Sequence, residues 1–171
     1  MEQIDEKMFA QLARLAGFGR TGFCSAAAFT AEREAVERGP EIAERRQLRF
    51  DPTADDPRTK SIAVMLWPYV PAAQEEDGCV FVDGYYFASN AAYHAARALE
   101  AQLTEAGRFA KANASYPARE AALRAGMGVI GQNGMLITPE YGSRFVIILM
   151  ATDIAHEEPD RAEKNGCLRC G

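Results

Sequence analysis

Two patterns of apolar residues, one spaced at helical intervals and one continuous, predict a helix and a strand. Apolar side chains at helical intervals predict an amphipathic helix over residues 3–16, which ends at Gly17. The unbroken apolar run SIAVMLWPY, residues 61–69, predicts a buried strand that Pro68 stops. Helix and strand are therefore both expected in the core.

The segment between these two elements predicts helix and then loop. Thr30 is placed to cap a helix through residues 31–38, and Pro40 interrupts it because proline has no N–H to donate. A second helical piece is expected over residues 41–48. Residues 49–60, rich in proline and aspartate, predict a loop.

The middle of the chain predicts a strand and two more helices. Residues 79–87, CVFVDGYYF, have the composition of a strand and turn. Residues 89–106 are rich in good helix formers, and Gly107 supplies a stop. A short helix is expected over residues 116–124, capped by Ser115.

The remaining segments predict strands and a polar tail. Residues 20–26 suggest a short strand. Residues 134–139 and 143–153 suggest two strands joined as a hairpin around residues 140–142. The tail, residues 154–171, is polar and loop-like. This order of elements predicts an α+β fold with a central, mostly antiparallel sheet flanked by helices, since no regular β-α-β alternation is present.

Composition narrows the class of protein. The chain has 171 residues, a size that suggests one domain, and a net charge of −5 that argues against nucleic acid as its partner. No apolar run approaches the roughly 20 residues that span a bilayer, and the acidic start lacks the features of a signal peptide. We therefore expect a cytoplasmic protein without a membrane partner.

Residues 125–133, AGMGVIGQN, contain a literal G-x-G-x-x-G. A dinucleotide-binding loop needs a strand before the first glycine and a helix after the last, and here the order is reversed. Gly126 is instead expected to end a helix in the left-handed conformation. Gly128 and Gly131 would then be turn residues or points of close backbone approach, and so many glycines predict a loop that lines a ligand pocket.

Cys167 and Cys170 form a C-x-x-C motif near the end of the chain. This is the first half of a ferredoxin motif, and it also suits a redox dithiol. Four thiolates normally hold a 4Fe-4S cluster, and zinc would be equally short of ligands. Cys24 and Cys79 lie in apolar, strand-like contexts and are interpreted as core residues.

Four segments together resemble the epoxyqueuosine reductase family of iron–sulfur proteins, which is related to reductive dehalogenases. They are residues 48–52 (LRFDP), 55–71 (DDPRTKSIAVMLWPYVP), 91–103 (AAYHAARALEAQL) and 119–153, which include the glycine loop. The C-x-x-C then falls where the ferredoxin-like segment of that family begins. The chain is interpreted as a divergent or truncated member.

The resemblance implies a pocket domain over residues 1–158, distantly like nitroreductases, and the start of a 4Fe-4S segment over residues 159–171. It implies a small-molecule cofactor or substrate, with cobalamin as the candidate, and an electron donor. Cys167 and Cys170 would bind metal, with the cluster completed only in a full-length protein. The implied cofactor-binding residues are His94, Arg119, Gly126, Gly128, Gly131, Gln132 and Asn133.

Departures from the family pattern keep alternatives open. The family's proton-donating aspartate has no counterpart at residues 112–114, which are Ala, Asn and Ala, so no catalytic residue is assigned. Ala92 replaces the aspartate of its D-Y-H motif, and Val129 and Gln132 replace a tryptophan and a lysine. One alternative is a non-catalytic corrinoid-binding or electron-transfer module. A weaker one is a flavin or nucleotide enzyme.

Overall fold

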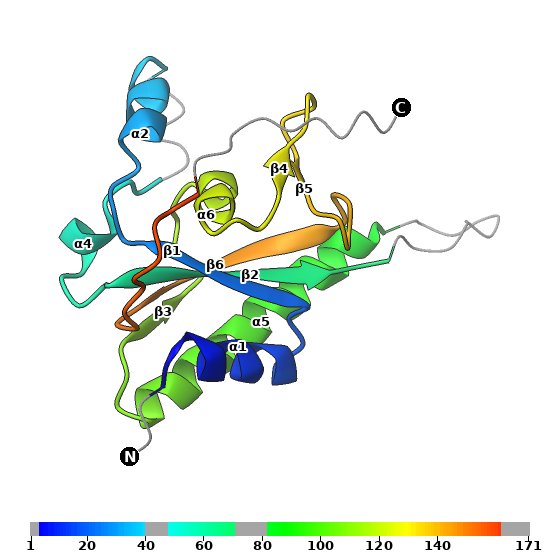
Figure 1. Cartoon of the computed structure of the whole chain (residues 1–171). Coiled ribbons are helices and arrows are strands. Elements are labelled where there is room, and N and C mark those ends of the chain that lie inside the picture. The colour runs from blue at the N-terminus through cyan, green and yellow to red at the C-terminus, as the bar shows by residue number, and fades with distance from the viewer. Residues whose placement is uncertain (1–3, 40–47, 71–81, 162–171) are drawn as a thin grey trace.

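The computed structural model describes residues 4–39, 48–70 and 82–161. The elements in this part of the chain are α1 (Glu6–Leu15), β1 (Arg20–Ser25), α2 (Thr30–Glu37), α4 (Pro52–Asp55), β2 (Ser61–Pro68), α5 (Gly84–Glu105), β3 (Ala110–Ala112), α6 (Ala118–Arg124), β4 (Val129–Ile130), β5 (Leu136–Ile137) and β6 (Phe145–Thr152). Helices cover both faces of one twisted sheet (Figure 1).

The main sheet has the strand order β1-β2-β6-β3, and every pair in it is antiparallel. The predicted α+β class with an antiparallel sheet flanked by helices is confirmed. β2 and β6 form the centre and pair along their whole length, from Ser61 opposite Thr152 to Pro68 opposite Phe145. Strands in this position are covered on both faces, which explains why their sequences are continuous apolar runs.

Successive residues of β2 divide the core into two layers. Ala63 and Met65 pack with α1 and α5 on one face, and Ile62, Val64 and Leu66 pack with α6 and the glycine loop on the other. All five side chains are fully buried. Figure 1 shows the same division, with α1 and α5 below the sheet and α6, β4 and β5 above it.

Glycines end the helices where the sequence predicts. α1 begins after Asp5, whose carboxylate accepts from the Met8 amide, and it closes at Gly17 with φ +108°. α5 closes at Gly107 with φ +75°. Left-handed backbone is inexpensive for glycine, so both helices stop there.

Four local expectations are wrong. Residues 84–87 form the first turn of α5 and not a strand, because the Asp83 carboxylate caps the Tyr85 amide. α4 lies inside the expected loop, with Asp51 as its cap. α2 starts at Thr30 itself, without a side-chain cap. α6 starts at Ala118 after Pro117, and Ser115 does not cap it.

The expected hairpin between residues 134–139 and 143–153 is also wrong. β5 pairs with β4, so the glycine loop supplies its partner, and β6 pairs with β2 and β3. Only the isolated bridge between Thr138 and Gly142 marks the turn. The long apolar run of β6 is buried at the centre of the main sheet, where both of its edges are paired. β5 therefore pairs with β4, which is closer to it in the sequence.

After β6 the chain turns back and crosses β1 toward α6 (Figure 1). The His156 ring stacks on Phe23 and its Nδ1 lies 2.6 Å from a carboxylate oxygen of Glu6. Further on, both carboxylate oxygens of Asp160 accept hydrogen bonds from Ser25. None of the helices described is long and apolar enough to cross a membrane. Residues 41–47 of the expected helix and residues 79–81 of the expected strand lie outside the described residues.

Candidate functional site

The glycine loop, residues 125–134, starts as a helix stop. Gly126 has φ +63°, its amide donates to the Leu123 carbonyl at 2.8 Å, and the Met127 amide donates to the Ala122 carbonyl at 2.9 Å. This pair of bonds is the Schellman arrangement, so the expected role of Gly126 as a left-handed helix end is confirmed.

Beyond the helix, the loop folds onto β5. A Cβ at position 128 would overlap the carbonyl oxygen of Ile137, and one at position 131 would lie 2.7 Å from the Ile137 Cδ1. Gly128 and Gly131 are therefore points of close approach, as the sequence suggests, and the partner is this hairpin itself.

The loop also rests on β1 at Gly22, a residue that sequence reasoning missed. A Cβ there would lie 2.6 Å from the Met127 sulfur and 3.3 Å from the Ala125 carbonyl oxygen. A glycine inside a strand is the signal that could have revealed it, because such glycines often mark close approach of another backbone.

Two hollows open beside this loop. The larger, the hairpin pocket, has a volume of about 840 Å³, and its lining includes Pro68, Tyr69, Asn133, Ile137, Tyr141 and Arg144. The smaller, the arginine pocket, has a volume of about 540 Å³, and its lining includes Arg20, Gly126, Gly128, Ile137, Glu140 and Arg161. Both volumes lie in the range of small-molecule sites. The loop thus borders both hollows, and its expected role in binding a ligand stays a prediction.

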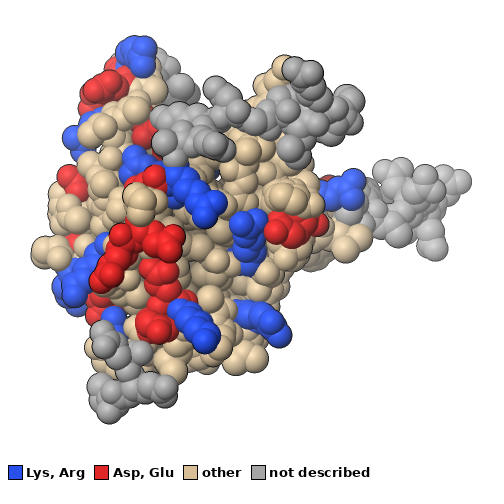
Figure 2. Space-filling model, viewed as in Figure 1, with Lys and Arg blue, Asp and Glu red and all other residues tan. Residues whose placement is uncertain are grey.

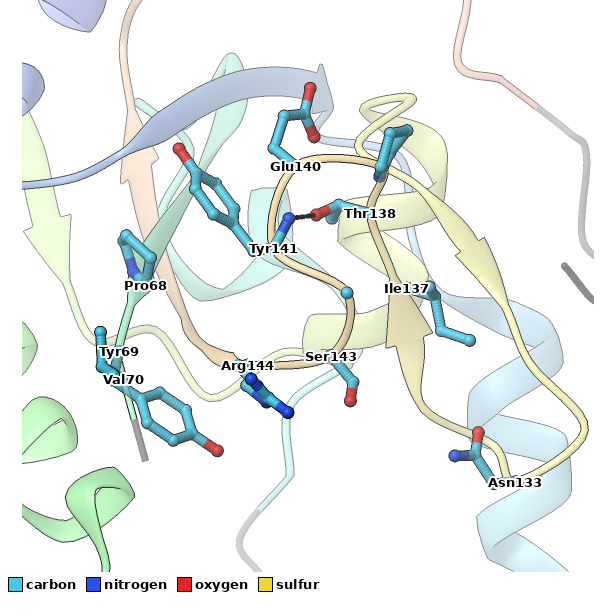
Figure 3. A pocket seen from close by; sticks show the side chains of 12 residues that line it. Pro68, Tyr69, Val70, Asn133, Ile137, Thr138, Glu140, Tyr141, Ser143 and Arg144 are labelled. Carbon is cyan, nitrogen blue, oxygen red and sulfur yellow. Dashed lines mark hydrogen bonds between the residues drawn. The ribbon is translucent and has the colours of Figure 1, made fainter. Parts of the chain in front are cut away.

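Figure 3 shows how the hairpin pocket is built. Tyr69 and Arg144 lie on one side, while Asn133 and Ile137 belong to the β4–β5 hairpin on the other. The turn between β5 and β6 is held by the Thr138 hydroxyl, which accepts from the Tyr141 amide at 3.1 Å. Thr138 is buried, so its hydrogen bond fixes the pocket wall.

The structure divides the predicted cofactor-binding residues of the glycine loop between the two pockets. Gly126 and Gly128 line the arginine pocket and Asn133 lines the hairpin pocket. Between them, Gly131 is buried in the turn and Gln132 is exposed.

Neither pocket is lined by the other two predicted cofactor-binding residues, Arg119 and His94. The Arg119 guanidinium donates to the Gly134 carbonyl, so it ties α6 to the hairpin turn. His94 is exposed on α5, on the opposite face of the sheet from the loop, with its ring edge-on to Tyr93. The structure thus separates His94 from the other candidates.

The predicted metal-binding residues Cys167 and Cys170 lie outside the described residues, as does Cys79. Cys24 is the cysteine within them, and it is fully buried. Burial, with the charge of Asp160 as a smaller cause, raises the pKa of its thiol to about 12. Among residues 4–39, 48–70 and 82–161, no group of three or more potential metal-binding side chains is found.

Asn113 is the polar side chain among residues 112–114, where the family resemblance places an acid. Its φ is +56°, and its amide nitrogen is buried without a hydrogen-bond partner in the described part of the chain. A buried amide donor without a partner lowers stability, and so does a left-handed backbone at a residue other than glycine. Both features occur at Asn113, as they often do at functional sites.

Solved structures share this fold. Epoxyqueuosine reductase from Bacillus subtilis, described with its catalytic loop swung out of the active site, is 22% identical, with a TM-score of 0.72 over 97% of this chain. Epoxyqueuosine reductase with a tRNA-Tyr epoxyqueuosine-modified tRNA stem loop is also 22% identical, with a TM-score of 0.72 over 96% of this chain. A reductive dehalogenase described in terms of B12-dependent dehalogenation is 16% identical, with a TM-score of 0.65 over 100% of this chain.

The matches differ in how much of each protein they include. This chain spans about half of those epoxyqueuosine reductases, 49% in both cases, and 22% of the dehalogenase. No protein-family profile and no curated protein matches the sequence. The resemblance to the epoxyqueuosine reductase family is therefore confirmed at the level of structure: this chain has a fold that epoxyqueuosine reductases and reductive dehalogenases contain.

Proposed function

We propose that this chain is the substrate- and cofactor-side domain of an iron–sulfur reductase that resembles epoxyqueuosine reductase. The observation that carries the proposal is the position of the glycine loop. The loop opens on two pockets, and the tail that leads toward Cys167 lies against it, with the Arg161 amide bonded to the Arg124 carbonyl at 2.8 Å.

Cobalamin is the cofactor that we propose for the hairpin pocket. A corrinoid is a flat ring with amide side chains at its rim, and the pocket combines Pro68, Tyr69 and Ile137 with polar groups from Asn133 and Arg144. Apolar walls with a few polar groups are typical of cofactor sites. When bound, the cobalt would supply electron transfer to the substrate, while the chain's own residues would hold and orient the ring.

A 4Fe-4S cluster does not fit the described residues. Thiolates bind such clusters, and Cys24 is buried with its pKa raised to about 12. The cluster proposal therefore rests on Cys167 and Cys170, which lie outside the described residues. Five residues separate Arg161 from Cys167. The six steps of extended chain from Arg161 to Cys167 span about 20 Å at most, which bounds the distance between the two residues.

The division into a pocket domain, residues 1–158, and the start of a ferredoxin-like segment, residues 159–171, is part of this proposal. Asp160 and Arg161 belong to the second unit by that boundary, yet they are bonded to β1 and α6. These bonds would fix the direction from which electrons arrive.

The proposed partners are a small-molecule cofactor or substrate and an electron donor. Nucleic acid is not among them, because the net charge is −5 and Figure 2 shows acidic and basic side chains interspersed on the face it presents. The neighbour solved with a tRNA stem loop makes RNA the alternative to test. Retention of a tRNA stem loop at about 150 mM salt, where phosphate contacts are largely screened, would contradict this choice of partners.

The cluster is tested on the complete gene product, reconstituted anaerobically and examined by absorption and EPR spectroscopy. We expect a cluster signal that the double substitution Cys167→Ser and Cys170→Ser abolishes and Cys24→Ser preserves. Absence of a signal, or its survival in the double variant, would refute the cluster.

The corrinoid is tested separately with hydroxocobalamin. Trp67 is the single tryptophan of the chain and precedes Pro68, which lines the hairpin pocket, so its fluorescence should be quenched saturably. Quenching that rises without saturation would leave no role for a corrinoid.

A further inference from the structure

Two guanidinium groups from distant parts of the sequence line the arginine pocket. Arg20 comes from the start of β1 and Arg161 from the tail after β6, and both lie beside the glycine loop. The chain as a whole carries a net charge of −5, so two cations around one hollow of about 540 Å³ call for an explanation.

Arg20 is held in the wall of this pocket by several acceptors. Its Nη1 donates to the Met127 carbonyl at 3.1 Å and its Nη2 to the Gly126 carbonyl at 3.3 Å, and Nη1 also contacts both carboxylate oxygens of Glu140. The guanidinium has a further donor at Nε. These bonds fix the position of the positive charge before any ligand arrives.

Arg161 is positioned by the backbone around it. Asp160 accepts from the Ser25 amide at 2.7 Å and from its hydroxyl at 2.6 Å, while the Arg161 amide donates to the Arg124 carbonyl. The Arg161 side chain then lies directly over Gly126, where a Cβ would come within 2.5 Å of Cδ and 2.8 Å of Nε. Gly126 therefore provides the space that lets this side chain reach the pocket.

The charges lining the pocket do not cancel. Glu140 is the carboxylate in its lining, it is half exposed, and it faces Arg20. One carboxylate against two guanidiniums leaves a positive balance. The apolar part of the lining consists of Leu123, Met127, Val129, Ile137 and Pro139.

We infer that the arginine pocket binds the carboxylate or phosphate group of a small organic ligand, with the apolar body of that ligand against the glycine loop. Guanidinium groups match the planar, paired oxygens of both anions. The inference goes beyond the proposed function, because it needs neither a cluster nor a corrinoid and uses only described residues.

The test is a titration of the 171-residue chain followed by ¹⁵N–¹H NMR. Hexanoate and hexyl phosphate serve as probes, and hexanamide serves as the uncharged control of the same length. We expect both anions to shift the amides of Gly126 and Gly128 saturably, with hexanamide at least tenfold weaker. The tighter of the two anions identifies whether carboxylate or phosphate is preferred. Equal binding of hexanamide, or shifts that do not saturate, would overturn the inference.

Variants separate the pocket from general surface charge. Arg161→Gln removes one cation and should weaken anion binding about tenfold, the effect of losing one charged hydrogen bond, while Arg161→Lys should retain part of it. Arg97→Gln, on α5 at the other face of the sheet, should bind like the unmodified protein. An unchanged spectrum away from the loop shows that Arg161→Gln is folded. If a folded Arg161→Gln binds as tightly as the parent, the assignment is wrong.

Discussion

The carbonyl oxygen of Ile137 occupies the space that a Cβ on Gly128 would need. This contact brings the start of β4 against β5, which pair through Val129 and Ile137. The two pockets share Ile137 in their lining, so the contact sets the shape of the wall between them.

We expect Gly128→Ala to destabilise the protein by about 2 kcal/mol, because a backbone carbonyl in a paired strand cannot move aside cheaply. Chemical denaturation measures the change. Gly107→Ala is the matched control, since nothing lies within 4 Å of its Cβ and only its φ of +75° is strained. Its cost should be about 1 kcal/mol. A Gly128→Ala variant as stable as the parent would mean that the contact is not tight.

Arg119→Gln should loosen the β4–β5 turn, since the guanidinium donates to the Gly134 carbonyl. The bond is exposed, so we expect a global loss of about 1 kcal/mol or less. Hydrogen exchange at the Gly131 and Gly134 amides, which form the bonds of this turn, should quicken more than elsewhere. Arg14→Gln on α1 is the control. Unchanged exchange at both amides would favour a direct ligand-binding role for Arg119.

The Cys24 thiol should not react with Ellman's reagent near neutral pH in the folded protein, because burial raises its pKa to about 12. The measurement uses a variant in which serine replaces Cys79, Cys167 and Cys170, so that Cys24 is the one thiol able to react. It should react at once in denaturant. Rapid labelling of the native protein would contradict its burial.

The same shift has a consequence for pH. Between about pH 9 and 12 an unfolded thiol at Cys24 loses its proton while the buried one keeps it, so the free energy of unfolding falls as pH rises. The unmodified protein should therefore lose stability with pH more steeply than Cys24→Ala. Parallel curves for the two proteins across this range would argue against the shift.

Asp160→Ala should release the tail from β1, because it removes the acceptor of two hydrogen bonds from Ser25. Trypsin cleavage after Arg161 should become several-fold faster, since the site opens locally. Glu158→Ala, an exposed change in the same segment, should leave the rate as it is. The idea fails if both variants are cut at the parental rate.

Much of the fold follows from the sequence because local rules decide it. The apolar run of β2, the helical spacing of α1 and the stops at Gly17, Gly107 and Gly126 each depend on neighbouring residues only. The same local rules predict the first turn of α5 wrongly. Its aromatic composition favours a strand, but the Asp83 side chain caps it as the start of a helix.

Strand pairing and the pockets were decided by tertiary structure. The apolar sequence of β6 would allow it to pair with β5 or with β2. Packing against the helices on both faces of the main sheet places β6 beside β2, and β5 then pairs with β4. Arg20 and Arg161 are separated by most of the chain, and no periodicity links them. The sequence by itself determined α1, most of α5, the central strand β2 and a glycine loop that bends. Which hollows that loop borders, and which charges face them, depended on long-range contacts, because side chains far apart in sequence meet only once the sheet has formed.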